Sequence, residues 1–198
     1  MADIGQAQAN AELVRDLLGS LGLESDSKIL FAGAGPGQMF DYVDGKNLLP
    51  FDLTFTDISE HFLEKVSERA RSAGLTKFRA LLDDVEAPKV NGPFHVVVLV
   101  LVLEHVNWKK ALGALSRLGV ERFLIVIQRN PPEVATNVSP NRPLRGSLQK
   151  ASQGEKAHLI SSDELVREME PLGYRIERMD NREVLDGKTM CGFLFARS

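Results

Sequence analysis

Three glycines at alternate positions, Gly33, Gly35 and Gly37, directly follow the apolar run 28–32. Glycine allows the backbone to approach a ligand closely and to adopt the positive φ angles of a tight turn. A dinucleotide-binding fingerprint would require a further glycine at position 38, where this sequence has Gln38. A phosphate-binding loop would end in lysine and a hydroxyl residue, and both are missing. The pattern alone leaves two interpretations open: a ligand-binding loop and a plain tight turn.

Acidic residues end the next two predicted strands. Asp57 lies about twenty residues after the last loop glycine, where a carboxylate can accept hydrogen bonds from both hydroxyls of a ribose. The alternative is that Asp57 caps the following helix, a role for which Ser59 competes. Asp83 and Asp84 form an adjacent, mutually repelling pair. One of the two could accept a hydrogen bond from an adenine amino group, and the alternative is a solvated turn.

A glutamate and a histidine, Glu104 and His105, follow the apolar run 96–103. A histidine in this position can act as a base, donate an orienting hydrogen bond, or sit as a satisfied residue under the sheet edge. His95 lies within the same predicted strand, and we expect it to be structural.

The elements that must position these residues alternate between strand and helix. Apolar runs bounded by glycine or polar turns predict strands, and apolar residues at helical spacing predict helices. Alternation of this kind predicts a parallel sheet with right-handed crossovers, hence one doubly wound α/β domain whose ligands bind beyond the carboxyl ends of the strands. The predicted strands are 28–32, 51–59, 77–84, 93–105, 121–128, 174–184 and 188–198, and the predicted helices are 8–22, 38–43, 59–74, 107–119 and 161–173.

Composition narrows the functional classes. The chain has 198 residues and a net charge of −3, which argues against a protein that coats nucleic acid. Its single cysteine, Cys191, can form no internal disulfide and no cysteine-based metal site, so a reducing cytoplasm is the expected compartment. The run 96–103 is far shorter than the roughly 20 residues that a membrane-spanning helix needs, and the N-terminus has no signal-peptide pattern. We therefore expect a soluble cytoplasmic protein.

Taken in order, the GxGxG turn, the acid ending strand two, the aspartate ending strand three and the "LEHV" segment resemble the class I S-adenosylmethionine-dependent methyltransferases over roughly residues 28–128. The resemblance implies a Rossmann-like fold: a mostly parallel seven-stranded sheet with helices on both faces and an antiparallel C-terminal strand. It also implies S-adenosylmethionine as cofactor. The cofactor-binding residues that it implies are Gly33, Ala34, Gly35, Gly37, Asp57, Ile58, Asp83, Asp84, Val85, Val100 and Glu104.

Within that set the resemblance gives each group a part of the ligand. The glycine loop would approach the amino-acid portion, and Asp57 would bind the ribose hydroxyls. Ile58 would pack near the adenine, and Asp83 would accept from its amino group. The end of strand four would lie beside the transferred methyl. One departure is His95, where family members often carry aspartate. Another is "NPP" at 130–132, which follows strand five and which we interpret as a loop.

The acceptor is the part on which the sequence says least. We expect a single domain, 1–198, made of an N-terminal helix (1–27), a cofactor-binding core (28–128), a substrate-side loop (129–158) and a C-terminal helix with two strands (159–198). Arg142 and Arg145 in the long basic loop are candidate contacts to a carboxylate or phosphate of the acceptor, the alternative being a solvated loop. If the acceptor must lose a proton, His105 is the candidate base.

The predicted function is methyl transfer from S-adenosylmethionine to an acceptor, by in-line displacement. The expected acceptor is a small molecule, with no membrane and no nucleic acid as partner and no prediction of oligomeric state. Two alternatives come from other classes: a methyltransferase-like subunit that binds the cofactor without catalysis, and an NAD(P)-dependent oxidoreductase.

Overall fold

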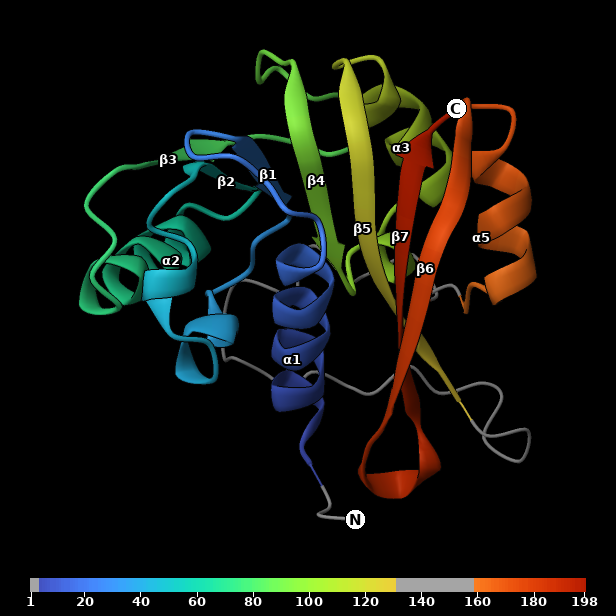
Figure 1. Cartoon of the computed structure of the whole chain (residues 1–198), viewed down its shortest axis with the longest axis horizontal. Coiled ribbons are helices and arrows are strands. Elements are labelled where there is room, and N and C mark those ends of the chain that lie inside the picture. The colour runs from blue at the N-terminus through green and yellow to red at the C-terminus, as the bar shows by residue number, and fades with distance from the viewer. Residues whose placement is uncertain (1–3, 131–158) are drawn as a thin grey trace.

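The computed structural model describes residues 4–130 and 159–198. Seven strands form one sheet in the order β3-β2-β1-β4-β5-β7-β6 (Figure 1). β7 is antiparallel to both β5 and β6, and the other pairs are parallel. The predicted doubly wound fold with its antiparallel C-terminal strand is therefore confirmed. The strands are β1 Lys28–Ala32, β2 Asp52–Asp57, β3 Phe78–Leu82, β4 Phe94–Val100, β5 Val120–Arg129, β6 Tyr174–Glu183 and β7 Thr189–Arg197.

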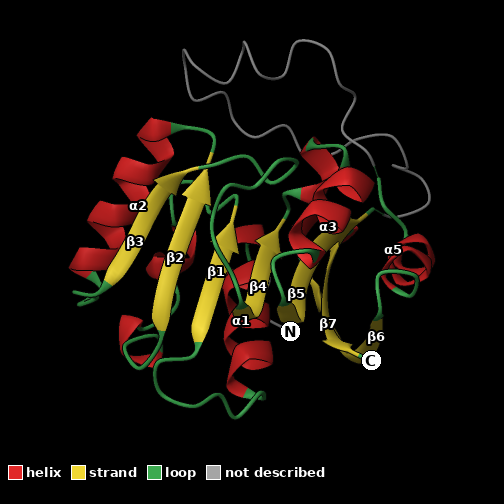
Figure 2. Cartoon of the chain, turned by 90° about the horizontal axis from the view of Figure 1, so that it is seen from above, coloured by secondary structure: helices red, strands yellow, loops and turns green. Residues whose placement is uncertain are grey.

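Helices cover both faces of the sheet (Figures 1 and 2). The helices are α1 Gln6–Gly19, α2 Glu60–Ser72, α3 Trp108–Ser116 and α5 Ser162–Met169. α1 and α2 share one hydrophobic core with Ile29 and Phe31 of β1, whereas α3 and α5 share the other core with Leu30 and Ala32. Because side chains alternate along a strand, an almost wholly apolar β1 supplies both cores. None of the described helices is long and apolar enough to cross a membrane.

The connection from β1 to β2 lacks the α-helix that the sequence predicts at 38–43. Two short 3-10 helices stand there instead, η1 Gln38–Asp41 and η2 Gly45–Asn47. Gly37 enters η1 in the left-handed conformation, and Asp44 caps η2 by accepting from the backbone N–H of Lys46. Helix nucleation is costly, and a segment of this length between two turns offers too few residues to offset that cost.

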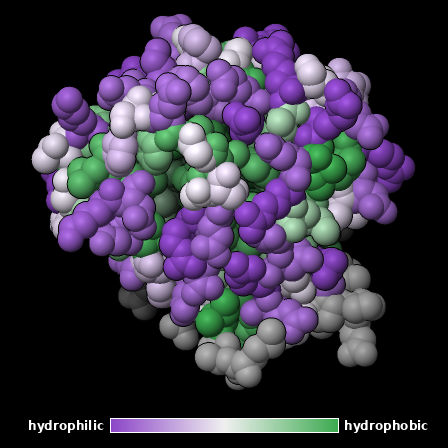
Figure 3. Space-filling model, in the orientation of Figure 1, coloured by the Kyte–Doolittle hydropathy of each residue, from purple (hydrophilic) through white to green (hydrophobic). Residues whose placement is uncertain are grey.

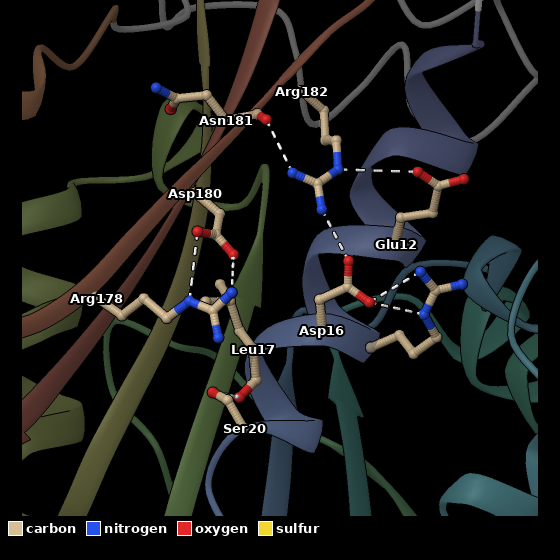
Figure 4. Close-up of polar contacts among 9 residues, drawn as sticks. Glu12, Asp16, Leu17, Ser20, Arg178, Asp180, Asn181 and Arg182 are labelled. Atoms are coloured by element: carbon tan, nitrogen blue, oxygen red, sulfur yellow. Dashed lines mark hydrogen bonds and ion pairs between the residues drawn. The ribbon is translucent and has the colours of Figure 1, made fainter. Parts of the chain in front are cut away.

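The N-terminal helix is fastened across the face of the sheet (Figure 4). Arg182 of β6 lies 2.8 Å from Oδ2 of Asp16 and 3.9 Å from Oε2 of Glu12 on α1. Arg15 also pairs with Asp16. At the other end of α1, Gln6 Nε2 donates to Oε1 of Gln128 near the carboxyl end of β5, at 3.3 Å. These contacts set the N-terminal end of α1 beside the carboxyl edge of the sheet.

The molecular surface on the side of the sheet that α1 covers is largely hydrophilic, with apolar side chains in separate patches (Figure 3).

Two serines cap helices at the positions where the predicted helices begin. Ser59 caps α2 by accepting from the N–H of Phe62. Ser161, the first residue of the predicted helix 161–173, caps α5 in a reciprocal capping box with Glu164. The sequence therefore specifies where these two helices begin.

Candidate functional site

The carboxyl ends of β1 and β2 bring the glycine turn and two predicted acids together. Ala34 N donates to the carbonyl of Thr56 at 2.8 Å, and Asp83 N donates to the carbonyl of Asp57 at 3.1 Å. Gly35 N donates to Oδ2 of Asp57 at 2.9 Å. The predicted turn, Asp57 and Asp83 are thus hydrogen-bonded to one another at one edge of the sheet.

The three loop glycines have different physical reasons to be glycine, although each has a positive φ. A Cβ on Gly33 would lie 2.7 Å from Cγ2 of Val102, and a Cβ on Gly37 would lie 2.8 Å from Cγ2 of Val66. A Cβ on Gly35 would meet nothing within 4 Å. Gly33 and Gly37 are therefore required by packing within the protein. Gly35 is required only by its backbone conformation, and it leaves open space in which a ligand can approach the turn.

Asp57 organises the backbone around it. Its Oδ2 accepts from Gly35 N, and its Oδ1 accepts from Ser59 N at 3.0 Å. Burial raises the pKa of this carboxyl, while the backbone hydrogen bonds act in the opposite direction. The capping interpretation has a basis, because Asp57 supports the start of α2, although Ser59 is the residue that caps it. A carboxylate oxygen can accept more than one hydrogen bond, so ribose binding by Asp57 stays a prediction.

The pair after β3 divides into a buried and an exposed acid. The buried carboxylate of Asp83 accepts from the N–H groups of Asp84, Lys89 and Val90 at 2.9–3.1 Å. Asp83 therefore shapes the loop that follows, and its predicted bond to an adenine stays a prediction. Asp84 is exposed, and its Oδ1 accepts from Glu86 N at 2.8 Å. Val85 is buried in the core on the α3 side.

An apolar rim lies beside these acids. Ile58 is 67% exposed and Leu82 is 56% exposed, and Leu82 pairs with Asp57 in the register of β2 and β3. Large exposed apolar side chains grouped at a strand edge are typical of a binding surface. Sequence reasoning named Ile58 and missed Leu82. The signal was its place as the last apolar residue before Asp83.

The end of β4 carries a buried carboxyl. Val100 ends the strand half-buried, and Glu104 follows in the short 3-10 helix η3, Leu103–His105. Glu104 is only 1% exposed, and its Oε1 accepts from Gln128 N at 2.9 Å. Its Oε2 is buried and has no hydrogen-bond partner among the residues that the structure describes. Burial raises the pKa of this carboxyl to about 7.

The two histidines lie in different environments. His95 Nδ1 accepts from Lys28 N at 2.8 Å, where β1 begins, so its structural role is confirmed. His105 follows Glu104 with its side chain exposed to solvent, and partial desolvation lowers its pKa. Arg142 and Arg145 lie outside the described residues. Within the described parts of the chain, no group of three or more His, Cys, Asp or Glu side chains could hold a metal ion.

Comparison with known proteins finds one family match, and it spans these residues. Residues 29–119 match the family model described as a methyltransferase domain. No curated protein matches the chain in sequence.

Three solved structures illustrate the similarity in fold. Magnesium protoporphyrin IX methyltransferase from Synechocystis PCC 6803, with SAH bound, is 16% identical with a TM-score of 0.72, covering 97% of this chain and 83% of that one. A putative methyltransferase from Bacillus halodurans C-125 is 13% identical with a TM-score of 0.71, covering 94% and 98%. Geranyl diphosphate methyltransferase in complex with GPP and sinefungin is 15% identical with a TM-score of 0.71, covering 96% and 77%.

The three solved structures share the overall fold of this chain, with TM-scores of 0.71 to 0.72. The family match covers the segment that carries the glycine turn, both acids and Glu104. The resemblance seen in the sequence is therefore confirmed over residues 29–119, which match the methyltransferase domain, and the solved structures agree with it in fold.

Proposed function

We propose that the carboxyl edge of β1, β2 and β4 binds S-adenosylmethionine and that the protein transfers its methyl group to a small-molecule acceptor. The observation that carries the proposal is the turn at Gly35, which is open to a ligand and is held by Asp57. The family match supports it, as do the structural relatives that were solved with SAH or sinefungin.

The residues at this edge fit the ligand chemically. The open backbone at Ala34 and Gly35 suits the amino-acid portion, where a side chain would crowd the ligand. Asp57 is the group for the ribose hydroxyls. Ile58 and Leu82 offer apolar contact to the adenine ring, and the acids after β3 offer acceptors for its amino group. Carboxylates around the site also favour a ligand that carries a sulfonium charge.

The chemistry asks for little more than positioning. When bound, S-adenosylmethionine supplies a methyl group that its sulfonium charge has activated. The protein has to hold the acceptor in line with that group and keep water away. The segment from Leu101 to Glu104 is our candidate for holding the acceptor. It is fixed beside the glycine turn, because Val102 packs on Gly33 and Glu104 accepts a hydrogen bond from the end of β5. Leu101 has a φ of 54°, a conformation that non-glycine residues adopt rarely.

Two observations bear on the class of the acceptor. The names of two structural relatives refer to small molecules, a porphyrin and geranyl diphosphate. The net charge of −3 gives no general attraction to nucleic acid. Contacts from Arg142 and Arg145 to an anionic acceptor remain part of the proposal, as does the cytoplasm as compartment, which follows from the single cysteine.

The experiment that tests the proposal is thermal unfolding of the protein alone and with S-adenosylhomocysteine (SAH), NAD or NADP. A ligand at a hundred times its dissociation constant adds about 2.7 kcal/mol of stability. For a chain of this size we expect SAH to raise the Tm by roughly 5 to 10 °C and the nicotinamide cofactors to leave it unchanged. A rise with NAD or NADP alone would favour the oxidoreductase. A rise with SAH, but no methyl transfer to a broad panel of acceptors, would favour the binding-only subunit.

A further inference from the structure

The Glu104 carboxyl bridges the carboxyl ends of β4 and β5. It starts from η3, directly after β4, and reaches the backbone N–H of Gln128 near the end of β5. Gln128 is itself buried and accepts from Gln6 at the start of α1. The Glu104 carboxyl therefore links the ends of β4 and β5 directly, and Gln128 links both to the start of α1.

One of the two oxygens of that carboxyl makes no hydrogen bond within the described chain. Oε1 is satisfied by Gln128 N, but Oε2 is buried with no hydrogen-bond partner among the described residues. Buried polar atoms almost always have a partner, and an exception calls for a functional explanation such as catalysis or a ligand. Asp57 and Asp83 differ, because each of their carboxylates holds backbone N–H groups with both oxygens.

No cation neutralises this carboxyl in the described structure. Its hydrogen-bonded neighbours, Gln128 and through it Gln6, are uncharged amides. His105 is the next residue in sequence, and Arg129 follows Gln128, the hydrogen-bond partner of Glu104. The ion pairs of the described residues include none to Glu104. A carboxyl without a fixed counter-charge is free to exchange a proton near neutral pH.

We propose that Glu104, and not His105, takes the proton that the acceptor loses, and that the acceptor is therefore an uncharged nucleophile bearing O–H or N–H. This inference rests on the proposed function. In the step, a lone pair of the acceptor oxygen or nitrogen forms the bond to the methyl carbon. The electrons of the carbon–sulfur bond pass to sulfur, and the acceptor's proton passes to Oε2 of Glu104.

The alternative base is placed less well for this work. His105 is exposed, and its backbone N–H donates to the carbonyl of Val102 at 3.0 Å. A proton acceptor is most effective when it is held in a fixed position out of water. Glu104 meets both conditions, since it is 1% exposed and tethered to β5.

The test is an NMR titration of the full-length protein saturated with SAH, with its glutamate carboxyl groups isotopically labelled. Glu104→Gln identifies the resonance of interest, and Glu104→Asp, which keeps a carboxyl but withdraws it, serves the same purpose if the first variant does not fold. Two pairs of probes are added: phenol with its methyl ether anisole, and aniline with N,N-dimethylaniline. Within each pair the ring is the same, but only the first member can donate a proton.

We expect the Glu104 resonance to titrate near neutral pH and to shift with phenol or aniline but not with their capped partners. The matched control is Glu86, which also accepts from a backbone N–H, that of Asn107, and is paired with Lys110; its resonance should not respond to any probe. If Glu104 responds to neither phenol nor aniline, or responds equally to the capped compounds, this inference is wrong. If SAH does not stabilise the wild-type protein, the proposed function fails as well, so the two failures are distinguishable.

Discussion

The backbone N–H of Gly35 donates to Oδ2 of Asp57 at 2.9 Å, so the acid that ends β2 holds the turn that ends β1. The other carboxylate oxygen of Asp57 accepts from Ser59 at the start of α2. One buried side chain therefore sets both the turn and the helix that border the open space at Gly35. This arrangement makes the shape of the proposed cofactor site depend on Asp57 even before any ligand binds.

We predict that Asp57→Asn weakens both folding and SAH binding. The amide group turns a donor toward either Gly35 N or Ser59 N, which leaves one buried N–H without its acceptor. An unsatisfied buried group costs about 1–3 kcal/mol. Urea unfolding measures the loss of stability, and thermal unfolding with SAH measures the loss of binding. Asp44→Asn is the control, because exposed Asp44 also accepts from a backbone N–H, that of Lys46, on a turn outside the predicted cofactor residues. Equal losses in the two variants would contradict the role given to Asp57.

We predict that Gly35→Ala removes the SAH response while leaving the protein folded. A non-glycine residue in the left-handed region costs roughly 1–2 kcal/mol, and the new Cβ would stand in the open space that the ligand needs. Gly22→Ala provides a matched control, since Gly22 has a φ of 58° against 56° for Gly35 and also has nothing within 4 Å of an added Cβ. Both variants should lose similar stability. SAH should raise the Tm of Gly22→Ala as it does for the wild type, but not that of Gly35→Ala; a full SAH response in Gly35→Ala would place the ligand elsewhere.

The packing at Gly33 and Gly37 predicts two different rescue patterns. Gly33→Ala should destabilise by about 1–3 kcal/mol from overpacking, in addition to the cost of its left-handed φ, because the atoms nearest to the new Cβ all belong to the side chain of Val102. Val102→Ala should therefore recover part of that loss, a coupling that a double-mutant cycle of urea unfolding measures. Gly37→Ala should gain less from Val66→Ala, because the Cα of Val66 also lies 3.1 Å from the added Cβ. Equal recovery in both pairs would contradict this account.

The parts of the fold that could be predicted from the sequence are those that depend on residues close together in it, such as apolar periodicity and helix caps. β1 occupies the predicted range 28–32, and the two predicted C-terminal strands are present as β6 and β7. Ser59 and Ser161 cap the helices that they were expected to begin. The strand-end positions of the glycines and acids follow from the same periodicity, which is why the sequence alone brings them to one edge of the sheet.

The parts that could not be predicted depend on contacts between distant or irregular segments. The bond between Gln6 and Gln128 joins residues 122 apart in sequence, and no local pattern encodes it. The carboxylate of Asp83 binds the N–H groups of Lys89 and Val90, six and seven residues later. That geometry arises only when the irregular loop has folded. Periodicity shows that an acid ends a strand, but not whether its oxygens face a ligand or the protein's own backbone.

The raised pKa of Glu104 predicts a specific dependence of stability on pH. Burial moves this pKa from 4.5 to about 7, so the folded state binds the proton more tightly than the unfolded state. The stabilisation that results is complete below about pH 4.5 and is lost as the pH rises through about 7. Each pKa unit is worth about 1.4 kcal/mol, so the wild type should lose roughly 3 kcal/mol of stability from this group across that range.

Urea unfolding of wild type and Glu104→Gln at a series of pH values gives the difference between their free energies of unfolding. Taking this difference cancels the contributions of other groups, including Asp57 with its raised pKa. The variant should gain stability relative to the wild type as the pH rises toward neutrality. A constant difference at all pH values would show that Glu104 ionises in the folded protein as it does in the unfolded chain.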